Sequence, residues 1–153
     1  MTNRRLSARA RSVLSMIRRH GQVSRAVLIR ESGLSGTAIF RATEELEAAG
    51  LVRSGESVIA GRGQPSTTIH IEPDAAFSLG LSVMTDRADV VLIDMAGTVR
   101  ARREVTCADM SRSAIIAEVL RFCDDVFAAS GLDRRRLQAK CVSLERYRNF
   151  IRQ

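Results

Sequence analysis

Aromatic side chains are what this sequence of 153 residues has least of. They make up 4% of it and tryptophan is absent, so a core has to be built from Leu, Ile, Val and Ala. No run approaches the roughly 18 to 20 apolar residues that a membrane helix needs. The Arg-rich N-terminus also lacks the apolar stretch and cleavage site of a signal peptide. We therefore expect a cytoplasmic protein that does not enter a membrane.

Clustered metal ligands are missing as well. The three cysteines, Cys107, Cys123 and Cys141, are widely spaced, and His20 and His70 lie near none of them in the sequence. A zinc site needs its ligands in close groups, and no C-x-x-C pair is present. The sequence therefore predicts reduced, partly buried thiols and no metal site.

Acidic residues are nearly absent from the first 43 positions. This stretch holds nine arginines against a single acid, Glu31, whereas the other 110 residues carry 15 bases and 16 acids. The whole net charge of +7 therefore originates in the N-terminal part. Positive charge concentrated in this way attracts a polyanion, and duplex DNA or RNA is the commonest one in a cell.

Three helices are predicted in the first fifty residues, because helical periodicity there alternates with capping signals. Ser24 is expected to cap a second helix over about 25–32, and Ser35 a third that runs to about residue 49. Glycines that favour the left-handed conformation end the three helices: Gly21, Gly33 and Gly50. Two short helices joined by a tight turn with glycine form a helix-turn-helix.

The apolar spacing predicts which side of each helix is buried. The expected buried positions are Leu6, Ala10, Val13, Leu14 and Ile17 in the first helix, Ala26, Leu28 and Ile29 in the second, and Ile39, Ala42 and Leu46 in the third.

The other side of the third helix has the composition of a DNA-reading surface. Gly36 and Thr37 are small enough to let its first turn enter a major groove, and Arg41 can then bond a guanine or grip a phosphate. Ser35 and Thr37 can donate hydrogen bonds. Arg25, at the start of the second helix, is placed for a phosphate contact.

Phe40 is unusual on such a surface and leaves two alternatives open. Its ring either touches a thymine methyl group or turns inward to complete a small core. The acids of the third helix, Glu44, Glu45 and Glu47, lie in its second half. That is the half away from DNA, where carboxylates escape repulsion by phosphates.

A β-hairpin is predicted after the third helix. Strands over 51–54 and 67–71 flank a glycine-rich tip at 61–65, which makes the hairpin the wing of a winged helix. Arg62 lies between two glycines at this tip, a setting that allows close approach to a minor groove.

Three segments together resemble transcriptional regulators of the ROK (repressor, open reading frame, kinase) family, of the xylose-repressor type. They are SRAVLIRESGLSGTAIFRATEELEAAGLV (24–52), GRGQPSTTIHIEPDA (61–75) and FSLGLSVMTDRADVVLIDMAGTVRARREV (77–105). The resemblance implies a wing in which Gln64 replaces a second arginine and joins Arg62 at the DNA. It also implies that residues after 76 begin an actin-like ATPase fold that binds sugars.

The sequence departs from that family at the sites of its chemistry. Sugar kinases of the family have an Asp-x-Gly-Gly-Thr phosphate loop, whereas the corresponding residues here read GLSVMT (80–85). Losing the loop that holds phosphates argues against an enzyme. The family's zinc and sugar-contacting motifs are absent too. We therefore expect no catalytic residues, no cofactor, no bound sugar effector, and a chain truncated early in the sugar-binding domain.

The second half reads as a β-meander followed by a helix. Strands are predicted over 77–84, 88–95 and 98–107, with Asp94 interpreted as a turn residue beside Gly97. Ser111 or Ser113 is expected to cap a helix that runs to about 129. Its expected apolar face is Ile115, Ile116, Val119, Leu120, Cys123, Val126 and Phe127. After Leu132 the pattern degrades.

The resulting expectation is an α+β chain in two parts. Residues 1–75 form a winged helix-turn-helix, and residues 76–153 form a partial actin-like ATPase-fold lobe of a three-stranded meander plus a helix. The expected function is transcriptional regulation by binding double-stranded DNA as a homodimer, as a repressor of sugar-related genes. A degenerate sugar kinase and a non-functional truncated regulator fragment are the alternatives.

Overall fold

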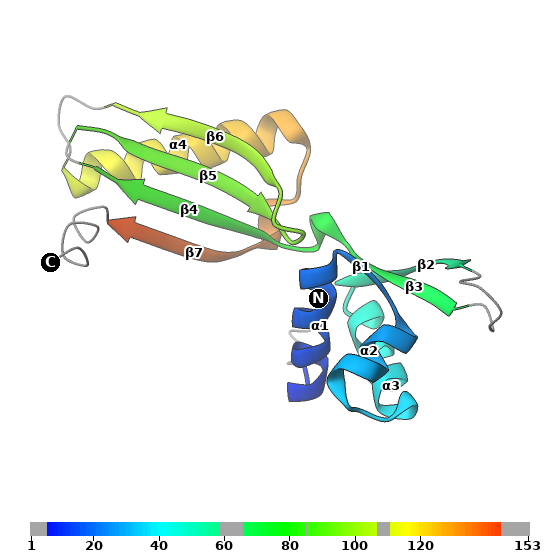
Figure 1. The fold of residues 1–153 in the computed structure, drawn as a ribbon. Coiled ribbons are helices and arrows are strands. Elements are labelled where there is room, and N and C mark those ends of the chain that lie inside the picture. The colour runs from blue at the N-terminus through cyan, green and yellow to red at the C-terminus, as the bar shows by residue number, and fades with distance from the viewer. Residues whose placement is uncertain (1–5, 59–65, 85, 107–110, 145–153) are drawn as a thin grey trace, which may run out of the picture. The chain divides into compact units, whose positions relative to one another are not determined.

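The computed structural model describes residues 6–58, 66–84, 86–106 and 111–144. The chain divides into two compact units, Met1–Ala75 and Ala76–Gln153 (Figure 1). Both helices and strands are present, which confirms the expected mixed fold class.

The first unit combines three helices with a small antiparallel sheet. The helices are α1 (Ala8–His20), α2 (Arg25–Ser32) and α3 (Gly36–Ala48). The strands β1 (Gln22–Ser24), β2 (Val52–Val58) and β3 (Ser66–Ile71) pair in the order β1-β3-β2. Figure 1 shows β2 and β3 leaving the helices as a two-stranded ribbon, so the winged helix-turn-helix predicted from the sequence is confirmed.

Serine side chains begin the helices as predicted. Ser24 Oγ accepts from Val27 N at 3.4 Å, and Ser35 Oγ accepts from Ala38 N at 3.3 Å. Each bond satisfies one of the backbone donors that the first turn of a helix leaves unpaired. Gly33 ends α2 with φ +67°, a conformation that only glycine adopts readily, and so sets the turn between α2 and α3.

The core of the first unit is aliphatic. Its fully buried large side chains include Val13, Ile17, Leu28, Ile39 and Leu46. The inward faces expected for α1 and α3 are therefore confirmed at these positions.

The face expected for α2 is partly wrong. Only Leu28 is buried, whereas Ala26 and Ile29 are exposed. A helix of eight residues turns little more than twice, so α2 can aim few side chains at the same core. Leu6 precedes α1 rather than belonging to it, and both Leu6 and Leu14 are only half-buried, whereas Met16 is buried in addition to the expected residues.

Strand β1 was not expected from the sequence. It connects α1 to α2 and pairs with β3, where Val23 lies opposite Ile69 and both side chains are buried. A strand of three residues has too few positions to show an alternating pattern.

The second unit is a four-stranded sheet with one long helix. Strands β4 (Phe77–Val83), β5 (Ala88–Asp94) and β6 (Val99–Val105) form the expected meander, followed by α4 (Arg112–Ser130) and β7 (Leu137–Leu144). The order is β6-β5-β4-β7, and β7 runs parallel to β4. The expectation of a three-stranded sheet is thus incomplete, because β7 joins the sheet by pairing with β4, a strand some sixty residues earlier.

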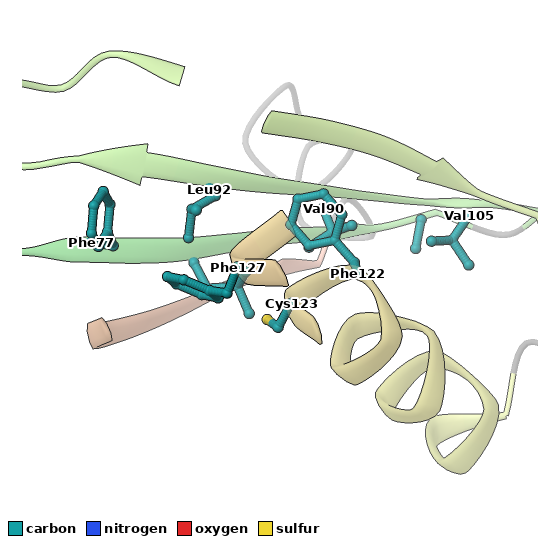
Figure 2. Packing of buried hydrophobic residues seen from close by; sticks show 9 residues of the cluster. Phe77, Val90, Leu92, Val105, Phe122, Cys123 and Phe127 are labelled. Atoms are coloured by element: carbon teal, nitrogen blue, oxygen red, sulfur yellow. The ribbon is translucent and has the colours of Figure 1, made fainter. Parts of the chain in front are cut away.

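Helix α4 packs on the sheet through a mixed aromatic and aliphatic cluster, drawn in Figure 2. Phe77 of β4 meets Phe127 of α4 edge to face, with ring centroids 6.0 Å apart. The cluster holds Phe77, Leu79, Ala88, Val90, Leu92, Val105, Phe122, Cys123 and Phe127. Two residues expected on this face, Ile116 and Leu120, are exposed instead, and Phe122 is buried.

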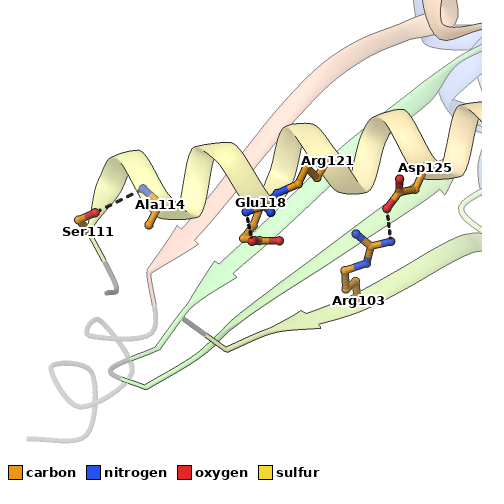
Figure 3. A network of polar contacts seen from close by, with 6 residues as sticks. All are labelled: Arg103, Ser111, Ala114, Glu118, Arg121 and Asp125. Carbon is orange, nitrogen blue, oxygen red and sulfur yellow. Dashed lines mark hydrogen bonds and ion pairs between the residues drawn. The ribbon is translucent and has the colours of Figure 1, made fainter. Parts of the chain in front are cut away.

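Polar contacts fix the N-terminal end and one side of α4 (Figure 3). Ser111 caps the helix by accepting from Ala114 N at 3.3 Å, so of the two candidate caps it is Ser111 that serves. Arg103 of β6 donates to Asp125 at 2.8 Å and ties the edge strand to the helix. No helix in the described parts of the chain has the length and apolarity that a bilayer crossing requires.

Replacing Phe122 by alanine should lower the free energy of unfolding by about 3–5 kcal/mol, since it empties a fully buried aromatic site. Urea denaturation followed by circular dichroism measures the change. Leu120→Ala is the matched control on the same helix: its side chain is 48% exposed, and a loss below about 0.5 kcal/mol is expected. Equal losses in the two variants would contradict the packing of α4.

Candidate nucleic-acid interface

Helix α3 has one buried side and one side that is exposed to solvent. Ile39, Ala42, Thr43 and Leu46 are buried in the first unit. The opposite side is exposed along the first three turns, at Ser35, Gly36, Thr37, Phe40, Arg41 and Glu44. The structure therefore brings together on one surface the α3 residues that the sequence assigned to DNA.

Two glutamates fasten the second half of α3 to its neighbours. Glu45 accepts two hydrogen bonds from Ser7, at 2.7 Å from the backbone N–H and 2.8 Å from the hydroxyl, and so joins α3 to the first turn of α1. Glu47 accepts from the Ser54 hydroxyl of β2. The acids that the sequence placed away from DNA thus orient the helix, a role that sequence spacing could not reveal because the partners are distant in the chain.

Phe40 points outward. Its side chain is 47% exposed, so the alternative of an inward ring that completes a core is wrong. The guanidinium carbon of Arg25 lies 5.3 Å from the centroid of the Phe40 ring. A cation over an aromatic face at this distance contributes about 0.5–1 kcal/mol at an exposed site. The first residue of α2 and the middle of α3 are therefore joined on the exposed surface.

Arg25 has a second distinctive feature. Its Nε–H is buried and meets no acceptor in the described residues. Buried donors are nearly always paired, because leaving one unmade costs about 1–3 kcal/mol. The aromatic contact with Phe40 therefore holds this side chain where no internal hydrogen bond does.

The arginines of the two units differ in their partners. Within the described residues of the first unit, seven arginines on the three helices form no ion pair: Arg9, Arg11, Arg18, Arg19, Arg25, Arg30 and Arg41. In the second unit six arginines pair with acids, among them Arg102 with Asp89 at 3.1 Å and Arg103 with Asp125 at 2.8 Å. Among the described residues, arginines without an acidic partner are thus concentrated in the helices of the winged helix-turn-helix.

The wing contains a packing feature that the sequence analysis missed. The β2–β3 pairing is irregular between Ser54 and Ser57, and Gly55 lies in that interval. A Cβ at Gly55 would fall 2.2 Å from His70 Nε2, and the imidazole itself lies 3.1 Å from Thr68 Oγ1. A lone glycine in a strand signals such a close approach, and this was the available clue.

Two of the expected site residues, Arg62 and Gln64, lie outside the described residues. Of the others, Ser35, Gly36, Thr37, Phe40 and Arg41 share the exposed side of α3, and Arg25 adjoins them through Phe40.

In the second unit, Asp94 is the last residue of β5, and its carboxylate serves the turn beside Gly97 that the sequence predicted. One carboxylate oxygen accepts from Thr98 N at 2.9 Å, and the other lies 3.4 Å from Arg100. Both contacts close the β5–β6 turn. Within the residues described, no three His, Cys, Asp or Glu side chains gather closely enough to hold a metal ion.

The N-terminal part matches a known domain family. Residues 2–53 fit the sequence model of winged helix-turn-helix DNA-binding domains. This match agrees with the three helices and the start of the wing seen in the structure.

Two longer proteins are similar to most of the chain. The uncharacterised protein y4fQ of Sinorhizobium fredii is 26% identical over 139 residues, which is 91% of this chain and 36% of that protein. A crystal structure of a ROK family transcriptional regulator, a homologue of the E. coli MLC protein, has a similar fold with a TM-score of 0.61 and 23% identity. The matched region covers 88% of this chain and 34% of the chain of that regulator. The chain thus spans about a third of the length of both proteins, and the resemblance drawn from the sequence is confirmed in the fold.

Ser35→Ala should destabilise the first unit by about 1 kcal/mol, since it removes the side-chain acceptor of the Ala38 N–H at the start of α3. Urea unfolding measures the loss. Ser35→Asn retains a capping oxygen and should stay within a few tenths of a kcal/mol of the original chain. A stable alanine variant would show that the cap does not hold this helix.

Proposed function

We propose that this chain is a transcription regulator that binds duplex DNA through the exposed side of α3 and the wing. The observation that carries the proposal is an exposed helix surface that begins with small residues, together with seven arginines that have no acidic partner among the described residues. Phosphates supply the negative charge that this surface lacks.

The proposed binding mode follows from the side chains. The first turns of α3 enter the major groove, because Gly36 and Thr37 leave room for close approach. Arg41 then reaches a guanine edge or a phosphate. Ser35 uses its oxygen to cap α3, so its hydroxyl proton is free to be donated to a phosphate. We assign Arg62 and Gln64 to the minor groove at the tip of the wing.

A regulator is favoured over an enzyme by the first strands of the second unit. Gly80 lies where a sugar kinase of the resembled family would begin its phosphate loop. In this structure a Cβ at Gly80 would fall 2.9 Å from Val91 Cγ2, so the glycine is explained by strand packing. Phosphoryl transfer depends on a loop that positions phosphates and metal, and the GLSVMT stretch supplies no such residues.

The finer proposals rest on the likeness in fold to a ROK family regulator. They are that the chain acts in the cytoplasm, represses sugar-related genes, and binds a two-fold operator as a homodimer. Dimeric helix-turn-helix proteins contact half-sites about one helical turn apart, so symmetry of the bound sequence tests the dimer directly.

Arg41→Ala and Arg62→Ala should each weaken binding to DNA about tenfold or more, since each removes a contact to a base or a phosphate worth about 1–3 kcal/mol. Fluorescence anisotropy with duplexes selected by the full chain from a random pool measures this. Arg102→Ala is the charge-matched control, because Arg102 pairs with Asp89 in the second unit. Unchanged binding in both test variants would refute the assigned surface, and no enrichment of any duplex would refute DNA binding itself.

A further inference from the structure

We propose that Phe40 is a positioning residue for DNA binding: its ring holds the Arg25 guanidinium in place for a backbone phosphate. The inference rests on the proposed DNA binding and assigns to Phe40 a role other than direct base reading. It concerns how α2 and α3 act together on the duplex.

The contact between the two residues is the first support. Arg25 is the first residue of α2, and Phe40 lies in the middle of α3. The guanidinium carbon is 5.3 Å from the ring centroid. An arginine side chain in solution samples many rotamers, and stacking on a ring restricts them before any ligand arrives.

The hydrogen-bonding state of Arg25 is the second support. Its Nε–H is buried and has no acceptor in the part of the chain that the structure describes. No internal hydrogen bond through Nε therefore competes for the side chain, and its two terminal amino groups remain as donors. Two such groups in one plane fit the oxygens of a phosphate, which accept charge-assisted hydrogen bonds.

The backbone of Phe40 is itself held in place. Thr43 is fully buried, and its hydroxyl donates to the Phe40 carbonyl oxygen at 2.9 Å. The ring therefore projects from a helical turn that is held from the core side. Because nearly half of its surface is exposed, this phenyl group contributes little to the core, which leaves its presence on a basic surface to be explained by Arg25.

The test is a double-mutant cycle in the full chain. The probe is a mixed-sequence duplex of about 30 base pairs, titrated by anisotropy between about 50 and about 300 mM potassium chloride. Arg25→Ala should weaken binding about tenfold and reduce the slope of log Kd against log salt by about 0.9, the loss of one phosphate contact. Phe40→Leu, which keeps an apolar side chain without a π face, should cause most of the same loss.

The double variant separates positioning from independent action. Arg25→Ala with Phe40→Leu should bind no more weakly than Arg25→Ala alone, because the ring then has no guanidinium to hold. Phe40→Tyr keeps the π face and should restore the original affinity and slope. Arg30→Ala is the control on the same helix. When it is combined with Phe40→Leu, the fold-losses in affinity of the two single variants should multiply, since Arg30 makes no contact with the ring among the described residues.

Several results would overturn the inference while leaving DNA binding intact. They are a Phe40→Leu chain that binds with full affinity, a double variant whose losses multiply, or a Phe40→Tyr chain that loses as much as Phe40→Leu. The last result would indicate direct contact of the ring with a base. Absence of binding by the unaltered chain at the lowest salt would instead refute the proposed function.

Discussion

The burial of one side of α3 is the constraint on which the first unit depends. Ile39 and Leu46 are fully buried, and each contributes about 1.5–3 kcal/mol by leaving water. That burial fixes the rotation of the helix, and the rotation decides that Thr37 and Arg41 face outward. Glu45 and Glu47 then hold the helix to α1 and β2 through serine partners. The apolar stripe of α3 covers only part of the circumference of the helix, so burying it leaves the remaining side exposed for recognition.

Local signals in the sequence predicted the local structure well. Ser24 and Ser35 cap the helices they were expected to cap, because capping involves residues only three positions apart. Strands β1 and β7 could not be predicted in this way, since each exists through pairing with a distant strand. The outward ring of Phe40 was equally undetermined, because it depends on how the packing of Ile39 and Leu46 sets the rotation of α3.

Arginine has different roles in the two units. In the second unit, arginines such as Arg102 and Arg103 lie against carboxylates, so their charges cancel at short range. In the first unit, arginines such as Arg18 and Arg41 find no such partner among the described residues. Exposed ion pairs contribute only about 0–1 kcal/mol to stability, so leaving those arginines unpaired costs the fold little. The positive electrostatic field of the first unit can therefore attract a polyanion.

The parallel pairing of β7 with β4 has a consequence for the order in which the chain folds. The meander of β4, β5 and β6 joins neighbours through short turns, so it can form quickly. One edge of β4 then stays open until α4 and, after it, β7 have been made. During synthesis that edge exposes backbone donors and acceptors, the template on which chains aggregate. The time that α4 and β7 take to emerge sets how long the nascent second unit remains vulnerable.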